Sequence, residues 1–132
     1  MTPVLLTDVA DGVLTITLNR ADAHNALSPE LLCRLVDTLD AFEANADLQV
    51  AILTGAGTQA FCSGGDLGKT LPLFSGARLP ADSWDQRLLD DPRVRSVAPL
   101  REEPLSKPVI AAVNGVCVAA GAEILLGTDI RI

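Results

Sequence analysis

Apolar and polar residues alternate near the start of the chain, and this period of two is the pattern of half-buried strands. Residues 13–18 form such a run, with Leu14, Ile16 and Leu18 alternating with Val13, Thr15 and Thr17, and residues 4–9 form a second strand-like run before it. Asp11 and Gly12 lie between them and are residues that favour tight turns. The sequence therefore predicts a β-hairpin at the start of the chain.

The apolar period then changes from two to that of a helix. Ser28 is a typical N-cap, and Pro29 is favoured at the first helical position. We expect the helix to stop near Asn45, and residues 49–54 to form a short buried strand after it. The order strand, strand, helix, strand indicates a mixed α/β fold. The apolar residues at helical spacing, which would cover a sheet, are Leu31, Leu32, Leu35, Val36, Leu39 and Phe42.

A second strand-to-turn transition lies near the end of the chain. Residues 108–113 are apolar and rich in β-branched side chains, and the turn residues Asn114 and Gly115 follow them. Residues 119–122 are small, and Glu123 is expected in the first turn of a helix. Free N–H groups there could hold an oxygen that becomes negative, with a carboxylate close by. The alternative is a core strand and helix whose Glu123 only complements the helix dipole.

Composition limits the classes of function. A length of 132 residues, 48% of them hydrophobic, predicts one globular domain at most. The net charge of −7 argues against nucleic-acid or membrane partners. The N-terminus lacks a basic segment followed by a long apolar stretch, so we expect no secretion signal and a cytoplasmic location. Three cysteines without C-x-x-C spacing and a single histidine predict reduced thiols and no metal site; the cysteines are Cys33, Cys62 and Cys117.

Residues 55–60 match the G-x-G-x-x-A fingerprint of dinucleotide-binding turns. That turn must run straight into a long helix, whereas here residues 61–66 add two more glycines first. We therefore expect a turn followed by a glycine-rich loop whose backbone amides face a ligand. Cys62 or Ser63 as a nucleophile is disfavoured, because the only histidine, His24, lies far away in the sequence and no strand leads directly into Ser63.

Taken together, four segments resemble the N-terminal half of the enoyl-CoA hydratase/isomerase, or crotonase, superfamily. They occur in the family's order and at its spacing. The resemblance implies an α/β fold, a crotonase-like spiral of ββα turns that stops before the C-terminal helical trimerisation region. Residues 1–132 would then be a partial acyl-CoA-binding domain of an enzyme that forms homotrimers or hexamers. The segments are residues 18–20 with 25–27, 53–57, 61–67 and 107–132.

The resemblance also implies a site for a CoA thioester, with CoA as part of the substrate and no separate cofactor. Gly65 and Ala120 match the two backbone N–H donors of an oxyanion hole. Glu123 matches the first of two catalytic glutamates that add water to a trans-2-enoyl-CoA. Substrate-binding positions carried over in the same way are His24, Ala26, Ser63, Gly64, Asp66, Leu67 and Gly68; Ser63 and Leu67 would contact adenine, and Asp66 would help fix the loop.

Several departures leave alternatives open. The second glutamate has no counterpart in these 132 residues, so a non-catalytic acyl-CoA-binding fragment is the alternative to a hydratase. An isomerase or a thioester hydrolase would use the same oxyanion hole with acids placed differently. Ala120 stands where glycine is common, and it is tolerated only if its φ is negative. Residues 70–103 would line the acyl pocket or form a mobile surface excursion, and their arginines could meet CoA phosphates: Arg87, Arg93, Arg95 and Arg101.

Overall fold

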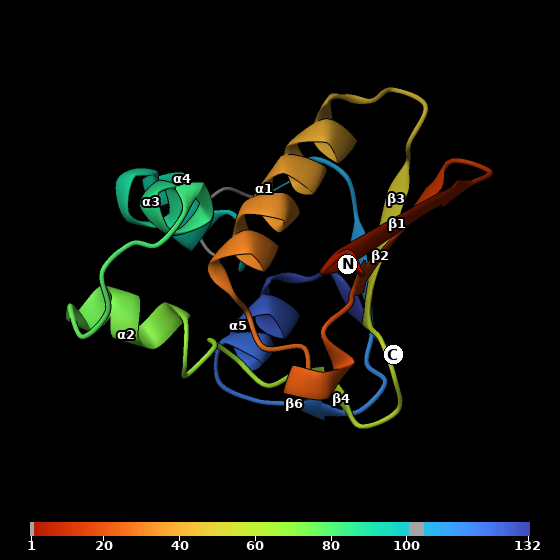
Figure 1. Cartoon of the computed structure of the whole chain (residues 1–132). Helices are drawn as coiled ribbons and strands as arrows, with labels where there is room; N and C mark the ends of the chain where they lie inside the picture. Colours follow the sequence, from red (N-terminus) through yellow and green to blue (C-terminus); the bar gives the residue numbers. More distant parts are fainter. Residues whose placement is uncertain (1, 101–104) are drawn as a thin grey trace.

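A five-stranded sheet runs through the computed structural model, which describes residues 2–100 and 105–132 (Figure 1). Its strand order is β1-β2-β3-β5-β7. The first pair is antiparallel and the other pairs are parallel. The mixed α/β class expected from the sequence is therefore confirmed. The strands are β1 (Leu5–Ala10), β2 (Val13–Leu18), β3 (Val50–Gly55), β5 (Val109–Ala112) and β7 (Ile130–Arg131).

The predicted hairpin is formed by β1 and β2, with Leu5 opposite Leu18 and Ala10 opposite Val13. In β2 every second residue is buried, as the alternation predicted. These buried side chains face the first long helix, α1 (Pro29–Ala44). The hydroxyl of Ser28 accepts a hydrogen bond from the N–H of Leu31 at 3.2 Å, which confirms the predicted N-cap.

Three short helices follow in the part of the chain with the weakest sequence signals: α2 (Thr70–Ser75), α3 (Ser83–Asp90) and α4 (Pro92–Ser96). Helix α1 lies between the sheet and α3 with α4 (Figure 1). The carboxylates of Asp82 and Asp91 accept backbone N–H groups at the starts of α3 and α4. The prolines therefore separate ordered helices, and residues 70–100 are not a structureless excursion.

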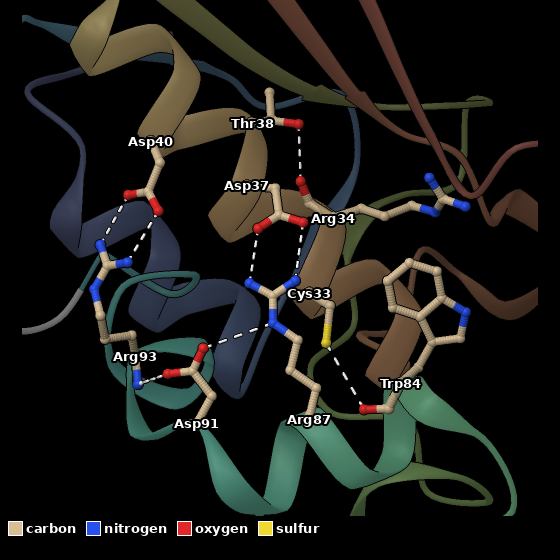
Figure 2. Close-up of polar contacts among 9 residues, drawn as sticks. All are labelled: Cys33, Arg34, Asp37, Thr38, Asp40, Trp84, Arg87, Asp91 and Arg93. Carbon is tan, nitrogen blue, oxygen red and sulfur yellow. Dashed lines mark hydrogen bonds and ion pairs between the residues drawn. The ribbon is translucent and has the colours of Figure 1, made fainter.

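Bidentate ion pairs fasten α3 and α4 to α1. The guanidinium of Arg87 donates to both oxygens of Asp37, at 2.7 and 2.9 Å, and that of Arg93 donates to both oxygens of Asp40, at 2.8 and 2.9 Å (Figure 2). Hydrogen bonding to Arg87 holds the pKa of Asp37 below its ordinary value. These pairs engage Arg87 and Arg93 with α1, which disfavours these two among the arginines expected to meet CoA phosphates. Arg101 lies outside the described residues.

A two-stranded sheet of β4 (Ala60–Cys62) and β6 (Val116–Cys117) packs beside helix α5 (Ala120–Gly127). The sequence predicted a turn and then a helix after the strand that ends near residue 113. The structure adds β6 between them and begins the helix at Ala120. β6 is only two residues long, too short for a periodic pattern to reveal it. No helix among the described residues has the length and apolar character needed to cross a membrane.

Candidate active site

A cavity of about 680 Å³ opens between two loops and the helices α2 and α4. The first loop, residues 63–68, follows β4, and the second loop, residues 118–121, leads from β6 into α5. The structure brings together eight of the ten predicted site residues, which all line this cavity: Ala26, Ser63, Gly65, Asp66, Leu67, Gly68, Ala120 and Glu123.

The first loop is tied to the segment before α1. The N–H of Leu27 donates to the carbonyl of Gly64 at 2.8 Å, and the N–H of Asp66 donates to the carbonyl of Leu27 at 3.1 Å. These two bonds form a parallel bridge between Leu27 and Gly65. Gly65 lies between the two bonded residues, so its own N–H points away from Leu27. The amide of Gly65 is therefore left out of the bridge, and Gly65 lines the cavity.

Asp66 closes the first loop with its carboxylate. One oxygen accepts the N–H groups of Gly68 and Lys69 at 2.8 and 2.9 Å. The other oxygen lies 2.9 Å from the guanidinium of Arg20, and only 14% and 13% of the Arg20 and Asp66 side chains are exposed. Partial burial acts to raise the pKa of Asp66, but these hydrogen bonds and the charge of Arg20 outweigh it and hold the pKa below its ordinary value. The expectation that Asp66 helps fix the loop agrees with these contacts.

The second loop meets β4 through close packing and through a hydrogen bond from the N–H of Val118 to the carbonyl of Cys62 at 3.2 Å. A Cβ atom at Gly121 would lie 2.2 Å from the carbonyl oxygen of Cys62, so the start of α5 can approach this strand only without a side chain. Ala119, the N-cap of α5, has φ 52° and ψ −128°. This conformation favours glycine, whereas Ala120 is not among the residues with positive φ. The strain considered for Ala120 therefore lies one residue earlier.

Gly65 and Ala120 line the cavity from different loops. Ala120 is the first residue of α5, where no acceptor exists one turn earlier within the helix. Within the described part of the chain, neither N–H donates to a protein acceptor. Neither N–H group is therefore used within the described part of the fold.

Glu123 brings a carboxylate to the same cavity from the first turn of α5. The only other carboxylate on the cavity lining that the structure describes belongs to Asp66. Asp66 is engaged by Arg20 and by two amides, so its carboxylate takes part in holding the first loop.

Two predicted residues lie outside the cavity lining. The exposed side chain of His24 lines a separate pocket of about 290 Å³, while its carbonyl accepts the N–H of Ser63 at 3.1 Å. Gly64 is buried, and a Cβ atom there would lie 2.8 Å from that of Ala119. Both residues thus hold the first loop in place through their backbones.

Two asparagines fix the turn that leads into the first loop, a role the sequence did not reveal. Asn25 is fully buried, and its side-chain amide donates to the carbonyls of Ala56 and Ala60 at 3.1 and 2.9 Å. The side chain of Asn114 donates to Ala60 at 3.2 Å and accepts the N–H of Gly55 at 3.0 Å. Both lie in segments of the resemblance, yet Asn114 was interpreted only as a turn residue.

The same geometry disfavours a nucleophilic hydrolase. Burial raises the pKa of the Cys62 thiol to about 11, so the thiol is neutral at pH 7, and Cys62 does not line the cavity. Ser63 lines the cavity, whereas His24 lines the separate pocket. No cluster of three or more potential metal ligands is present in residues 2–100 and 105–132.

Comparison with known proteins identifies the family of this chain. The enoyl-CoA hydratase/isomerase family model matches residues 8–132. The chain belongs to this family. It is 37% identical over 130 residues to (E)-benzylidenesuccinyl-CoA hydratase of Thauera aromatica, covering 98% of this chain and 46% of that protein. It is also 37% identical over 132 residues to 1,2-epoxyphenylacetyl-CoA isomerase of Escherichia coli, covering 100% of this chain and 48% of the relative.

Solved structures of the family share the fold. Superposition on the crystal structure of an enoyl-CoA hydratase from Bacillus anthracis gives a TM-score of 0.77 at 33% identity, covering 98% of this chain and 46% of that one. The predicted crotonase-like fold and the likeness to an N-terminal half are therefore confirmed. The chain spans about half the length of the curated relatives it matches. Those relatives include both a hydratase and an isomerase, so membership alone does not choose the reaction.

Proposed function

We propose that the cavity binds an acyl-CoA thioester and that this chain supplies part of an enoyl-CoA hydratase-type site. The observation that carries the proposal is the convergence of Gly65, Ala120 and Glu123 on one cavity. Two N–H groups from different loops suit a thioester carbonyl oxygen that gains negative charge during the reaction. In comparable sites one such donor lowers the barrier by about 2.7 to 4 kcal/mol.

In the proposed reaction, the carboxylate of Glu123 takes a proton from water as the water oxygen bonds to C3 of a trans-2-enoyl thioester. The C2–C3 π electrons shift toward the carbonyl, and the resulting enolate oxygen accepts hydrogen bonds from Gly65 and Ala120. A proton then adds to C2, which restores the carbonyl and gives the 3-hydroxyacyl thioester. Fixed donors need no reorganisation when the charge forms, so they stabilise the enolate more than the ground state.

Delivery of the C2 proton requires a second acid. Asp66, the other carboxylate on the described lining, is held by Arg20 and by two amides of its own loop. Loss of its charge would loosen the first loop, so we do not assign this proton to Asp66. Hydration therefore needs an acid from outside the described lining, and a non-catalytic acyl-CoA-binding fragment is the alternative without one.

Isomerisation is a second candidate because 1,2-epoxyphenylacetyl-CoA isomerase is as similar in sequence as the hydratase. It would use the same two donors with acids placed differently, as would thioester hydrolysis. We further propose a cytoplasmic protein that assembles as a homotrimer or hexamer, as the family resemblance implies. Fatty acid metabolism is the corresponding setting, and CoA would enter only as part of the substrate.

Glu123→Gln in the protein, at the length its source produces, tests the proposal. The amide is nearly the same size as the carboxylate but cannot take the proton, so hydration of crotonyl-CoA should fall about 10²- to 10⁴-fold. Loss of the enoyl thioester's ultraviolet absorbance measures the reaction, and calorimetric titration with butyryl-CoA measures binding. Intact mass of the native protein establishes the length first.

Asp129→Asn is the matched control, because Asp129 accepts the N–H of Val109 at 2.8 Å and does not line the cavity. It should leave hydration within about twofold of wild type, since it lies outside the reacting geometry. Retained hydration in Glu123→Gln would remove Glu123 as the base. Absence of both hydration and acyl-CoA binding in the wild-type protein would overturn the proposed function as a whole.

A further inference from the structure

The wall of the cavity that comes from residues 70–100 differs in chemistry from the two loops. Leu71 and Phe74 of α2 and Pro99 after α4 make it apolar. Arg95 of α4 is the one basic side chain on the cavity lining within residues 2–100 and 105–132. Arg95 is exposed, so its guanidinium is open to solvent and to a ligand in the cavity.

The ion pairs at the back of the same helices explain why Arg95 faces the cavity. Residues two apart on a helix point about 200° apart, so Arg93 and Arg95 lie on nearly opposite sides of α4. Arg93 binds both oxygens of Asp40 on α1 (Figure 2). That contact turns Arg95 toward the opposite side, where it reaches the cavity.

Arg95 keeps its hydrogen-bonding capacity for a ligand. Its guanidinium carbon lies 5.8 Å from the centre of the Phe74 ring, a contact that orients the side chain without occupying its N–H groups. Arg95 forms no ion pair with any residue that the structure describes. Arg87 and Arg93, by contrast, each bind both oxygens of an aspartate.

A guanidinium with this surplus of donors recognises a carboxylate or a phosphate through two parallel hydrogen bonds. A CoA thioester can offer either anion: phosphates on the CoA part, or a carboxylate on the acyl part. Leu71 and Phe74 favour the acyl part on this wall, because apolar side chains gain from contact with methylene groups and strongly hydrated phosphates do not. We infer that Arg95 selects acyl-CoA thioesters whose acyl group carries a carboxylate. This inference rests on the proposed binding of acyl-CoA.

Two saturated thioesters of equal chain length separate this inference from the proposed reaction, because neither can be hydrated. Adipyl-CoA ends in a carboxylate and hexanoyl-CoA ends in a methyl group. Calorimetric titration would compare their dissociation constants in the wild-type protein, in Arg95→Gln and in Arg95→Lys. Arg34→Gln is the matched control, because Arg34 pairs with Glu30 on α1 and does not line the cavity.

We expect Arg95→Gln to weaken adipyl-CoA binding about tenfold or more, since a hydrogen bond between charged groups is lost. Hexanoyl-CoA binding should change less than about twofold, and Arg95→Lys should restore part of the adipyl-CoA affinity. An equal loss for both thioesters would assign Arg95 to a CoA phosphate and overturn the inference. Unchanged binding of both would also overturn it, whereas failure of the wild-type protein to bind either would overturn the proposed function.

Discussion

The two loops of the cavity reach similar positions by different physical means. The first loop is held by polar contacts, in which Asp66 accepts two amides and pairs with Arg20. The second loop depends more on close packing, because Gly121 lies against the carbonyl of Cys62 and leaves no space for a side chain. Ala119, next to it, adopts a backbone conformation that favours glycine.

This difference decides how each loop should respond to change. The contacts of the first loop depend on the charges of Asp66 and Arg20, so they should weaken as pH or a substitution alters those charges. The packing of the second loop depends on side-chain volume, because close-packed atoms cannot accommodate an added methyl group unless the backbone moves. Both loops hold an N–H group of the proposed oxyanion hole, so disturbance of either one should reach the same chemistry.

Gly121→Ala should have the largest effect. The new Cβ atom would lie 2.2 Å from the Cys62 carbonyl oxygen and 2.9 Å from its carbon, and these backbone atoms must shift. We expect the free energy of unfolding to fall by about 3 kcal/mol or more, measured by urea denaturation. Enoyl-CoA hydration should fall too, because Ala120 would move with the start of α5.

Gly68→Ala supplies the control from the first loop. Its nearest neighbour would be an oxygen of Asp66 at 3.5 Å, an ordinary van der Waals contact, and its φ is not positive. Its unfolding free energy should stay within about 0.5 kcal/mol of wild type. Equal losses of stability in the two variants would contradict the view that close packing constrains Gly121 more than Gly68.

Asp66→Asn should have an intermediate effect on the first loop. The amide can still accept an N–H group but loses the ion pair with the mostly buried Arg20. We expect a loss of about 2 kcal/mol at pH 7 from urea denaturation. Asp22→Asn is the control, because Asp22 is exposed and its substitution should leave stability within about 0.5 kcal/mol.

The pH dependence of that loss gives a second measurement of the same prediction. The pKa of Asp66 is lower in the folded than in the unfolded protein, so its stabilisation is fully present above the unfolded value of about 4. It is lost as pH falls through the lowered folded pKa. The stability difference between wild type and Asp66→Asn should stay constant above about pH 5 and shrink below about pH 4. A pH-independent difference would show that the charge of Asp66 does not hold the loop.

The sequence predicted the first half of the fold well because its elements follow local rules. The hairpin, the capped helix α1 and strand β3 each show a period or a turn that physical chemistry links to one structure. The helices of residues 70–100 were less predictable, because α2 and α4 are too short for a helical period. Their positions depend on tertiary contacts such as the pair between Arg93 and Asp40.

The candidate site shows the same limit. Family resemblance indicated Gly65, Ala120 and Glu123, and all three line the cavity. No local pattern distinguishes Arg95, which faces the cavity, from Arg93 two residues earlier, which binds α1. That distinction depends on the position of Asp40, which lies opposite Arg93 in space. Backbone strain is equally hidden, since only the three-dimensional path around β6 shows that it falls on Ala119.

Ala119→Gly should have the smallest effect, and its sign tests the strain directly. An alanine at φ 52° and ψ −128° costs about 1 to 3 kcal/mol, whereas glycine adopts this conformation freely at an entropic cost of about 0.5 to 1 kcal/mol. We therefore expect the variant to be more stable by about 1 kcal/mol in urea denaturation. Ala122→Gly, placed within α5, should instead be less stable by about 1 kcal/mol, because glycine weakens a helix. If both substitutions destabilised equally, Ala119 would carry no strain, and packing at Gly121 alone would shape the second loop.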